Sequence, residues 1–296
     1  MNIVIKDRIR DISTVVTSFT IDFKSTIASI LRVLLLSSLK TSSRSKAYTN
    51  YQNRRRAIVL ANGPSLVESF ENEKIQYDDA DIFCVNNFYK SVYFHKVKPN
   101  YYCIVDGVYF NQINENCRKI GAELVKGLKD VNWDMFLVLP SYVPKSVASI
   151  YCSSPYITPL FVNTTSIEGF RFFRHWAYKQ QLGMPTCMNV STLAIMTALN
   201  IGHKDIRIFG LDHSWLKCYF VDEDNVFCSK EEHVYQEECK ITKFPGTTLV
   251  KNLDDFVKAL RVHFIIDEYA NSIGAKIYNC TKGSYVEAYE RINTKD

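Results

Sequence analysis

The sequence lacks the features that mark several classes of protein. Its nine cysteines are an odd number, lie far apart and include no C-x-x-C pair, which argues against a disulfide framework or a zinc site and favours a reducing cytosol. Only 11 glycines and 8 prolines occur in 296 residues, and 47% of the residues are apolar. Collagen, low-complexity and disordered classes are therefore excluded, and the chain is long enough for one large domain or two small ones.

Long apolar runs are also missing. A spanning helix needs roughly 18 uninterrupted apolar residues, and the best candidate, 25–39 (STIASILRVLLLSSL), is interrupted by Arg32. A secretory signal is not expected either, because Asp7 and Asp11 lie where a basic segment belongs and no small-residue cleavage site follows. We expect a cytoplasmic protein.

Positive charge is concentrated at the start of the chain. Residues 1–56 contain eleven Lys or Arg and three Asp, a net charge of +8, whereas the remaining 240 residues carry −3. A nucleic-acid-binding protein would spread its charge over the folded surface, so no nucleic acid is expected as a partner. The basic leader suits an anionic membrane surface, with 25–39 as an interfacial helix at the inner face of the cytoplasmic membrane. The alternative is that 25–39 packs on the body or forms a homo-oligomer contact, for which its helical spacing of apolar residues is also suited.

The body, 57–296, has the pattern of a parallel α/β sheet. Short runs of near-continuous apolar residues predict buried strands at 57–61, 81–86, 101–105, 136–140, 206–211 and 276–280. Helical patterns at 166–182, 189–201 and 252–273 lie between or after them. The insertion 213–250 is polar and carries clustered acids, as is typical of a lid or a binding loop.

Polar residues follow the predicted strands. In open parallel sheets ligands bind outside the carboxyl ends of the strands. Asn62 suits a helix N-cap, Gly63 permits close approach of a ligand, and Pro64 suits the first helical position, which leaves free N–H groups for an anion. Each such residue alone reads as a cap or turn residue, but together they indicate a binding site. The others are Ser65, Asn86, Asn87, Asp106, Gly107, Asp212, His213 and Ser214, with Asn189, Ser191 and Thr192 at the start of a helix.

Three segments carry a resemblance to a known family. A strand followed by NGPSL (62–66), a second strand ending in CVNNFY (84–89), and STLAIMTALNIGHKDIRIFGLD (191–212) together resemble bacterial inverting sialyltransferases that use CMP-activated sugars. Motility accessory factors that modify flagellin share the first motif. The resemblance covers most of 57–215 in outline and implies a Rossmann-like, GT-A-like domain with a lid, and displacement of the nucleotide with inversion at the anomeric carbon.

The resemblance also implies residue roles. Asn62 and Asn86 match the asparagines that hold the nucleotide and phosphate, and Asp106 stands where the family has a further Asn near the cytidine. Asn189 and Ser191 match the helix start that binds donor phosphate and carboxylate. The chain departs from the family at 187–190, where an Arg and a Thr-Ser are replaced, and after Asp212, where the expected Tyr is absent. The donor-binding set is thus Asn62, Gly63, Pro64, Ser65, Asn86, Asp106, Asn189, Ser191, Asp212, Ser214 and Tyr235.

A histidine is the side chain best suited to deprotonate an acceptor hydroxyl near pH 7. His233 lies in the insertion before the helix at 252–273, the chain order in which the resembled enzymes carry their catalytic histidine, and Tyr235 stands near enough to help bind phosphate. His213 is the second candidate because it directly follows a strand. The other four histidines lie before strands, in turns or within helices, where a packed or solvated role is usual: His95, His175, His203 and His263.

Metal-dependent transfer from a nucleoside diphosphate sugar is one alternative, but its two Asp-x-Asp candidates are badly placed. Asp79-Ala80-Asp81 precedes a strand, and Asp222-Glu223-Asp224 lies in the insertion. We therefore expect no metal and no cofactor other than the CMP-sugar substrate. A non-catalytic nucleotide- or glycan-binding module and an ATP- and Mg²⁺-dependent pterin pyrophosphokinase are further alternatives. The expected activity is transfer of a nonulosonic or similar acidic sugar to a hydroxyl of a bacterial surface glycan or glycolipid precursor.

Overall fold

A computed structural model describes residues 2–46, 56–72, 75–77, 79–111, 113–231 and 240–292. Within these residues, eight strands form one parallel sheet in the spatial order β11-β10-β6-β1-β2-β3-β4-β5. The predicted α/β class is therefore confirmed. The strands are β1 (Arg56–Leu60), β2 (Ala80–Val85), β3 (Tyr101–Cys103), β4 (Met135–Pro140), β5 (Ile157–Val162), β6 (Asp205–Phe209), β10 (Lys276–Asn279) and β11 (Glu290–Arg291).

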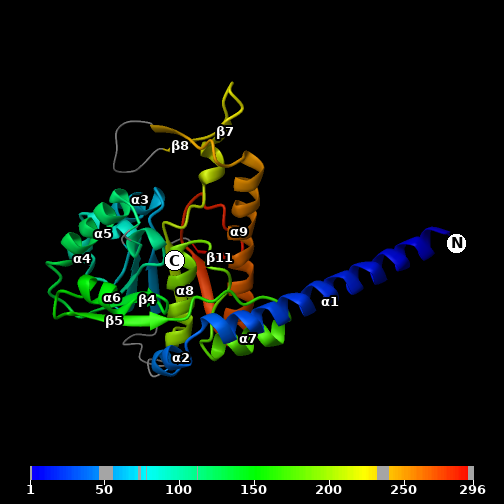
Figure 1. Cartoon of the computed structure of the whole chain (residues 1–296), viewed down its shortest axis with the longest axis horizontal. Coiled ribbons are helices and arrows are strands. Elements are labelled where there is room, and N and C mark those ends of the chain that lie inside the picture. The colour runs from blue at the N-terminus through cyan, green and yellow to red at the C-terminus, as the bar shows by residue number, and fades with distance from the viewer. Residues whose placement is uncertain are drawn as a thin grey trace.

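Helices cover both faces of this sheet (Figure 1). Alternate residues of β1 face opposite cores: Ala57 and Val59 pack with α8 (Val190–Ile201), while Ile58 and Leu60 belong to the core on the other face. One face carries α3 (Ser65–Asn72), α4 (Phe94–Val97), α5 (Glu115–Leu128) and α6 (Lys145–Tyr151), and the other carries α7 (Arg171–Lys179), α8 (Val190–Ile201) and α9 (Leu249–Ser272). Almost every residue of α8 is buried, which explains why its sequence is apolar all round.

The order of the strands predicts a crevice at the carboxyl ends of the central strands β1 and β6. From β1 the chain adds β2, β3, β4 and β5 on one side, and β6 then pairs with the opposite side of β1. At such a reversal a ligand crevice is expected outside the carboxyl ends of the two neighbouring strands. The loops after β1 and β6 contain the NGPSL motif and Asp212-His213-Ser214.

The insertion is more regular than its sequence indicates. A short 3-10 helix, η3 (Trp215–Cys218), leads into β7 (Tyr219–Val221), which pairs with β8 (Phe227–Glu231) and β9 (Lys240–Lys243) in an antiparallel sheet. Tyr219, Phe227 and Phe244 form an aromatic cluster on it. In Figure 1 this sheet lies beyond one end of α9.

The basic leader forms α1 (Asn2–Leu36) and α2 (Leu39–Lys46). The first half of α1 projects away from the body, and its second half runs beside α7 (Figure 1). Backbone N–H groups of Glu168 and Phe170 donate to the hydroxyls of Ser29 (2.8 Å) and Thr26 (2.9 Å). In the part of the chain that the structure describes, no helix is both long enough and apolar enough to cross a bilayer.

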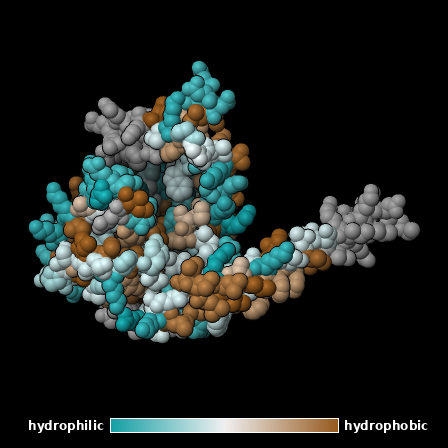
Figure 2. Space-filling model, in the orientation of Figure 1, coloured by the Kyte–Doolittle hydropathy of each residue, from teal (hydrophilic) through white to brown (hydrophobic). Residues whose placement is uncertain are grey.

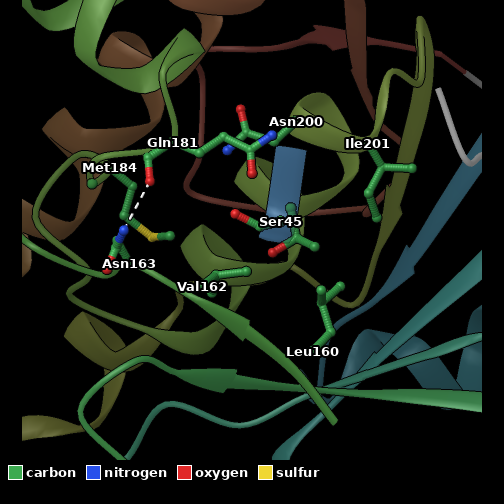
Figure 3. Close-up of a pocket in the computed structure, with 10 residues that line it drawn as sticks. Ser45, Leu160, Val162, Asn163, Gln181, Met184, Asn200 and Ile201 are labelled. Carbon is green, nitrogen blue, oxygen red and sulfur yellow. Dashed lines mark hydrogen bonds between the residues drawn. The ribbon is translucent and has the colours of Figure 1, made fainter. Parts of the chain in front are cut away.

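The residues that follow α1 are bound to the body. Asn163 accepts from the Ser38 N–H (3.0 Å) and donates to the carbonyls of Ser38 (3.1 Å) and Gln181 (3.0 Å). Figure 3 shows Asn163 and Gln181 beside Ser45 of α2, around a cavity of about 20 Å³, which has room for about one water molecule. Ser42 donates to the Gln180 carbonyl at 2.5 Å, so both α2 and the turn before it are hydrogen-bonded to the body.

Candidate functional site

A cleft of about 700 Å³ lies where β1, β2, β3 and β6 end and α8 begins. Ser65 lies beside it and contacts Asp212. His233 and Tyr235 fall outside the described residues, so their predicted roles stay predictions. The predicted site residues that line the cleft are Asn62, Gly63, Pro64, Asn86, Asp106, Asn189, Ser191, Asp212, His213 and Ser214.

Two glycines allow the loops after β1 and β6 to meet. The Gly63 N–H donates to the Gly210 carbonyl at 2.9 Å. A Cβ on Gly63 would lie 1.8 Å from Asp212 Oδ2 and 2.4 Å from the Gly210 oxygen. Gly210 has φ +70°, a conformation that is unfavourable for residues with a side chain. Gly63 therefore permits a close approach of the protein's own backbone and carboxylate, and the predicted close approach of a ligand stays a prediction.

Asp212 ties the β6 loop to the start of α3. Ser65 donates to it twice, from Oγ to Oδ2 at 2.8 Å and from the backbone N–H to Oδ1 at 3.3 Å. Burial raises the pKa of Asp212, and the hydrogen bonds from Ser65 act in the opposite direction. Both carboxyl oxygens thus have partners within the protein.

The two asparagines after β1 and β2 line the cleft. Asn62 Nδ2 donates to the Val85 carbonyl at 2.9 Å, which directs one edge of its amide to β2. Asn86 has φ +43°, and its backbone carbonyl accepts from the Tyr102 hydroxyl. Its Oδ1 is buried and has no hydrogen-bond partner among the described residues. A buried acceptor of this kind is expected to receive an N–H or O–H from a ligand or a water.

Asn189 caps α8, as its place at the helix start predicts. Its Oδ1 accepts from the Thr192 N–H at 3.1 Å and from the Ser191 hydroxyl. Because Oδ1 faces the helix, Nδ2 faces the cleft wall, where it lies 3.1 Å from Nε2 of His213. The first turn of α8 and the loop after β6 are thereby connected.

His213 lies between aromatic rings at the base of this loop. It has φ +48°, stacks on Trp215 with 4.7 Å between ring centroids, and is buried. Burial lowers its pKa to about 4, so the ring is neutral at pH 7. Its Nε2 lies 3.0 Å from Nε2 of His263, whose Nδ1 lies 2.8 Å from the Tyr289 hydroxyl.

His263 and Tyr289 are site residues that the sequence analysis did not identify. His263 was expected to be a packed helical histidine, and it is fully buried in α9. The signal was present, because His263 shares a buried stripe with Phe256, Ala259 and Ile266, and a polar ring on such a stripe needs a partner. Nothing near Tyr289 in the sequence points to His263.

Neither Asp-x-Asp triplet reaches the cleft. Asp81 is buried near the amino end of β2, as its position before the predicted strand indicates. One of its carboxylate oxygens lies 3.4 Å from His203 Nε2. Asp222 accepts from the N–H groups of Asp224 (3.1 Å) and Val226 (2.9 Å) and pairs with Lys243 at 2.6 Å, whose ammonium group lowers the pKa of Asp222. The described residues include no group of three or more His, Cys, Asp or Glu placed to hold a metal ion.

Comparison with known proteins identifies the family. Among solved structures, the MAf glycosyltransferase from Magnetospirillum magneticum AMB-1 is similar, with a TM-score of 0.50 and 11% sequence identity over 87% of this chain and 39% of that one. The chain thus spans about two fifths of that protein, and the likeness concerns the fold. No curated protein matches. A family model described as 6-hydroxymethylpterin diphosphokinase MptE-like matches residues 35–217, which is more than half of the sequence, and the chain therefore belongs to the MptE-like family.

Proposed function

We propose that this protein is an inverting glycosyltransferase that moves a nonulosonic or similar acidic sugar from a CMP-activated donor to a hydroxyl of a bacterial surface glycan or glycolipid precursor. The observation that carries the proposal is the cleft at the β1–β6 crevice, where the buried Asn86 Oδ1 lacks a partner among the described residues. The fold that the chain shares with a glycosyltransferase supports the same activity.

The polar groups of the cleft suit a nucleotide with one phosphate. Amide oxygens of Asn62 and Asn86 offer acceptors for the N–H and O–H groups of a nucleoside. The N-terminus of α8 offers backbone N–H groups and a positive helix dipole to an anion. A monophosphate leaving group carries less charge than a diphosphate, so such neutral donors suffice to stabilise it.

The reaction is a single displacement. The acceptor oxygen attacks the anomeric carbon on the face opposite the phosphate, and a C–O bond forms as the bond from that carbon to the phosphate oxygen breaks. The electron pair leaves with CMP, and the hydroxyl proton passes to a base. We assign the base to His233, because the lowered pKa of His213, about 4, makes the latter a weak base at pH 7.

Nucleotide binding tests the donor class. We expect CMP to raise the melting temperature of the full chain, and to do so more than UDP, GDP or ATP with Mg²⁺. Asn86→Ala should weaken CMP binding about fivefold, as expected for loss of one hydrogen bond. Asn271→Ala is the matched control, because the Asn271 side chain is exposed on α9 and donates to the Asp267 carboxylate at 2.8 Å. CMP release from a CMP-sugar should persist in excess EDTA.

The family description favours one alternative, transfer of a diphosphate from ATP to a pterin. That reaction uses Mg²⁺ to neutralise phosphate charge, and Asp106 and Asp212 are the carboxylates of the described cleft that would hold the ion. Both oxygens of Asp212 accept from Ser65, so this pair fits the ion less well than free carboxylates would. Stabilisation by ATP with Mg²⁺ and none by CMP would overturn the glycosyltransferase proposal.

We also propose that the leader places the cleft near an anionic lipid surface. Exposed apolar side chains occur along the described part of α1, and brown side chains gather over its second half and α7 in Figure 2. Phe172 and Trp176 of α7 are 75% and 54% exposed, and aromatic rings favour the lipid interface. Lys24 and Lys40 are exposed at the two ends of this stretch. The exposed large apolar residues of α1 are Val15, Val16, Phe19, Ile21, Phe23, Ile27, Ile30, Leu31, Leu34, Leu35 and Leu36.

A further inference from the structure

We infer that His213 is held as the neutral tautomer with its proton on Nδ1, and that this N–H donates to the anionic part of the ligand in the cleft. Asn189, His263 and Tyr289 are the positioning residues that fix this tautomer. The identity of the ligand as a nucleotide phosphate or sugar carboxylate rests on the proposed function, whereas the tautomer does not.

Asn189 determines whether His213 Nε2 carries a proton. The amide oxygen of Asn189 is committed to the first turn of α8, where it accepts from Thr192 and Ser191. The group that meets His213 Nε2 at 3.1 Å is therefore the amide N–H of Asn189. An N–H facing a ring nitrogen at this distance requires a lone pair on that nitrogen. His213 Nε2 is thus unprotonated.

His263 meets the same nitrogen. Its Nε2 lies 3.0 Å from His213 Nε2, and two bare nitrogens at this distance would place their lone pairs against each other. His263 Nε2 therefore carries a proton and donates it. A neutral imidazole has one donor and one acceptor nitrogen, so Nδ1 of His263 must accept.

Tyr289 completes the chain. Its hydroxyl lies 2.8 Å from Nδ1 of His263, and a tyrosine O–H donates to a bare ring nitrogen. Tyr289 and His263 are 3% and 0% exposed, so water competes weakly for either group. The hydrogen bonds all run in one direction, from Tyr289 to His263 to His213.

One polar ring atom of His213 remains. Within the described residues, no hydrogen bond engages its Nδ1, and the ring lines the cleft. Because Nε2 is bare, the single proton of the neutral ring lies on Nδ1. Burial lowers the pKa of both histidines, which keeps both imidazole rings uncharged at pH 7. His213 is therefore a donor to an anion and not a proton acceptor.

NMR of the full chain with ¹⁵N-labelled histidine tests the tautomer directly. At pH 7, without ligand, we expect a protonated Nδ1 and a bare Nε2 for His213, and the reverse for His263. Tyr289→Phe should give mixed tautomers at both rings. His263→Gln, which keeps a donor near the Nε2 position, should preserve the His213 pattern, whereas His263→Leu should not. His95→Gln, at an exposed position, is the control. A protonated Nε2 on His213, or a charged ring, would overturn the inference.

Binding of CMP and of cytidine tests the donor role. His213→Ala should weaken CMP binding about tenfold to a hundredfold, as for loss of a hydrogen bond to a charged group, while cytidine binding stays unchanged. His213→Asn should restore most of the loss, because its amide N–H replaces Nδ1–H and Asn tolerates a positive φ. An equal loss for CMP and cytidine would overturn the donor role. If the unaltered protein shows the expected tautomers but binds no CMP, the proposed function fails and the tautomer stands.

Discussion

Gly63 and Gly210 bring two loops closer together than side chains would permit. The contact also determines where Asp212 lies, because its carboxylate occupies the space that a Cβ on Gly63 would take. Asp212 in turn holds Ser65 at the start of α3. The shape of the cleft floor thus depends on the absence of one methyl group.

Gly63→Ala should destabilise the protein by about 1–3 kcal/mol, because backbone and a hydrogen-bonded carboxylate must move to admit the methyl group. Urea titration should show this loss in the free energy of unfolding, and the variant should also bind CMP more weakly. Gly246→Ala is the matched control, since a Cβ there meets nothing within 4 Å, and it should change stability by less than about 0.5 kcal/mol. Equal stability of the two variants would contradict the close approach.

The buried histidine pair should make stability depend on pH. An unfolded histidine has a pKa of about 6.5, whereas burial lowers the pKa of His213 to about 4 and that of His263 well below its usual value. Below pH 6.5 the unfolded chain therefore binds protons that the folded chain does not. Stability is full above this pH and falls as pH drops towards 4, by about 1 kcal/mol per pH unit for each histidine.

Urea unfolding at pH 7.5 and pH 5 measures this effect. His263→Gln should lose less stability between the two pH values than the unaltered protein, and the exposed-site variant His95→Gln should lose the same amount. Asp212, whose pKa is raised, opposes the trend equally in all three proteins and cancels in the difference. An identical pH response of all three would show that His263 is not held neutral.

Among the elements, α8 connects the sheet to the cleft through its cap. Asn189→Ala removes an N-cap and should cost about 1 kcal/mol, and it should also weaken CMP binding because the amide N–H to His213 is lost. Asn114→Ala is the matched control, since Asn114 caps α5 by accepting from the Cys117 N–H at 2.9 Å and does not line the cleft. Both variants should lose similar stability by thermal melting. Loss of CMP affinity in both, or in neither, would contradict a special role for the cap.

The sequence predicts most strands but not the periphery of the sheet. Buried parallel strands such as β1 and β2 are apolar on both faces, which makes them visible as short runs. By contrast, β5 (ITPLFV) has exposed Thr158 and Pro159, and Pro suits only an edge position, so its pattern is ambiguous. Pairing of β7, β8 and β9 depends on contacts across a polar insertion.

The candidate site was predictable where it depends on local order. Asn62, Asn86 and Asp212 follow strands directly, so their convergence follows from parallel topology alone. The partnership of His213 with His263 joins residues 50 positions apart, and Tyr289 lies beyond a further strand. Such contacts depend on how α9 packs, which no local pattern determines.

For the whole molecule, the leader divides into a free part and a docked part. Residues 13–20 are exposed throughout, whereas Ser29, Ser42 and Ser45 are buried. Removing residues 1–18 should therefore leave the melting temperature within a few degrees of the full chain. Removing 1–46 should lower it clearly, because Asn163 and the Glu168 N–H would lose their partners. Equal melting temperatures for both truncations, measured by calorimetry, would show that α2 adds nothing to stability.

Vesicle binding tests the lipid surface. We expect the full chain to cosediment with vesicles rich in phosphatidylglycerol and to be released by salt. Phe23→Glu with Leu34→Glu should abolish cosedimentation, while Val92→Glu with Ile113→Glu, at positions 87% and 80% exposed elsewhere on the body, should not. The contrary outcome is that the full chain fails to cosediment with lipid while light scattering shows that Phe23→Glu with Leu34→Glu converts a dimer to a monomer. That result would mean that the exposed apolar residues of α1 form a dimer interface and do not bind lipid.

The docking of α2 bears on how the protein avoids aggregation. The strand β5 is the last on its side of the sheet, and an uncovered edge strand is a template for pairing with another chain. Here α2 packs against β5, and Pro159 lacks the N–H that an incoming strand would use. The opposite edge, β11, is only two residues long. Loss of α2 would therefore remove the cover from an edge strand, and chains that lack residues 1–46 are expected to assemble through β5 into sheets that continue from one molecule to the next.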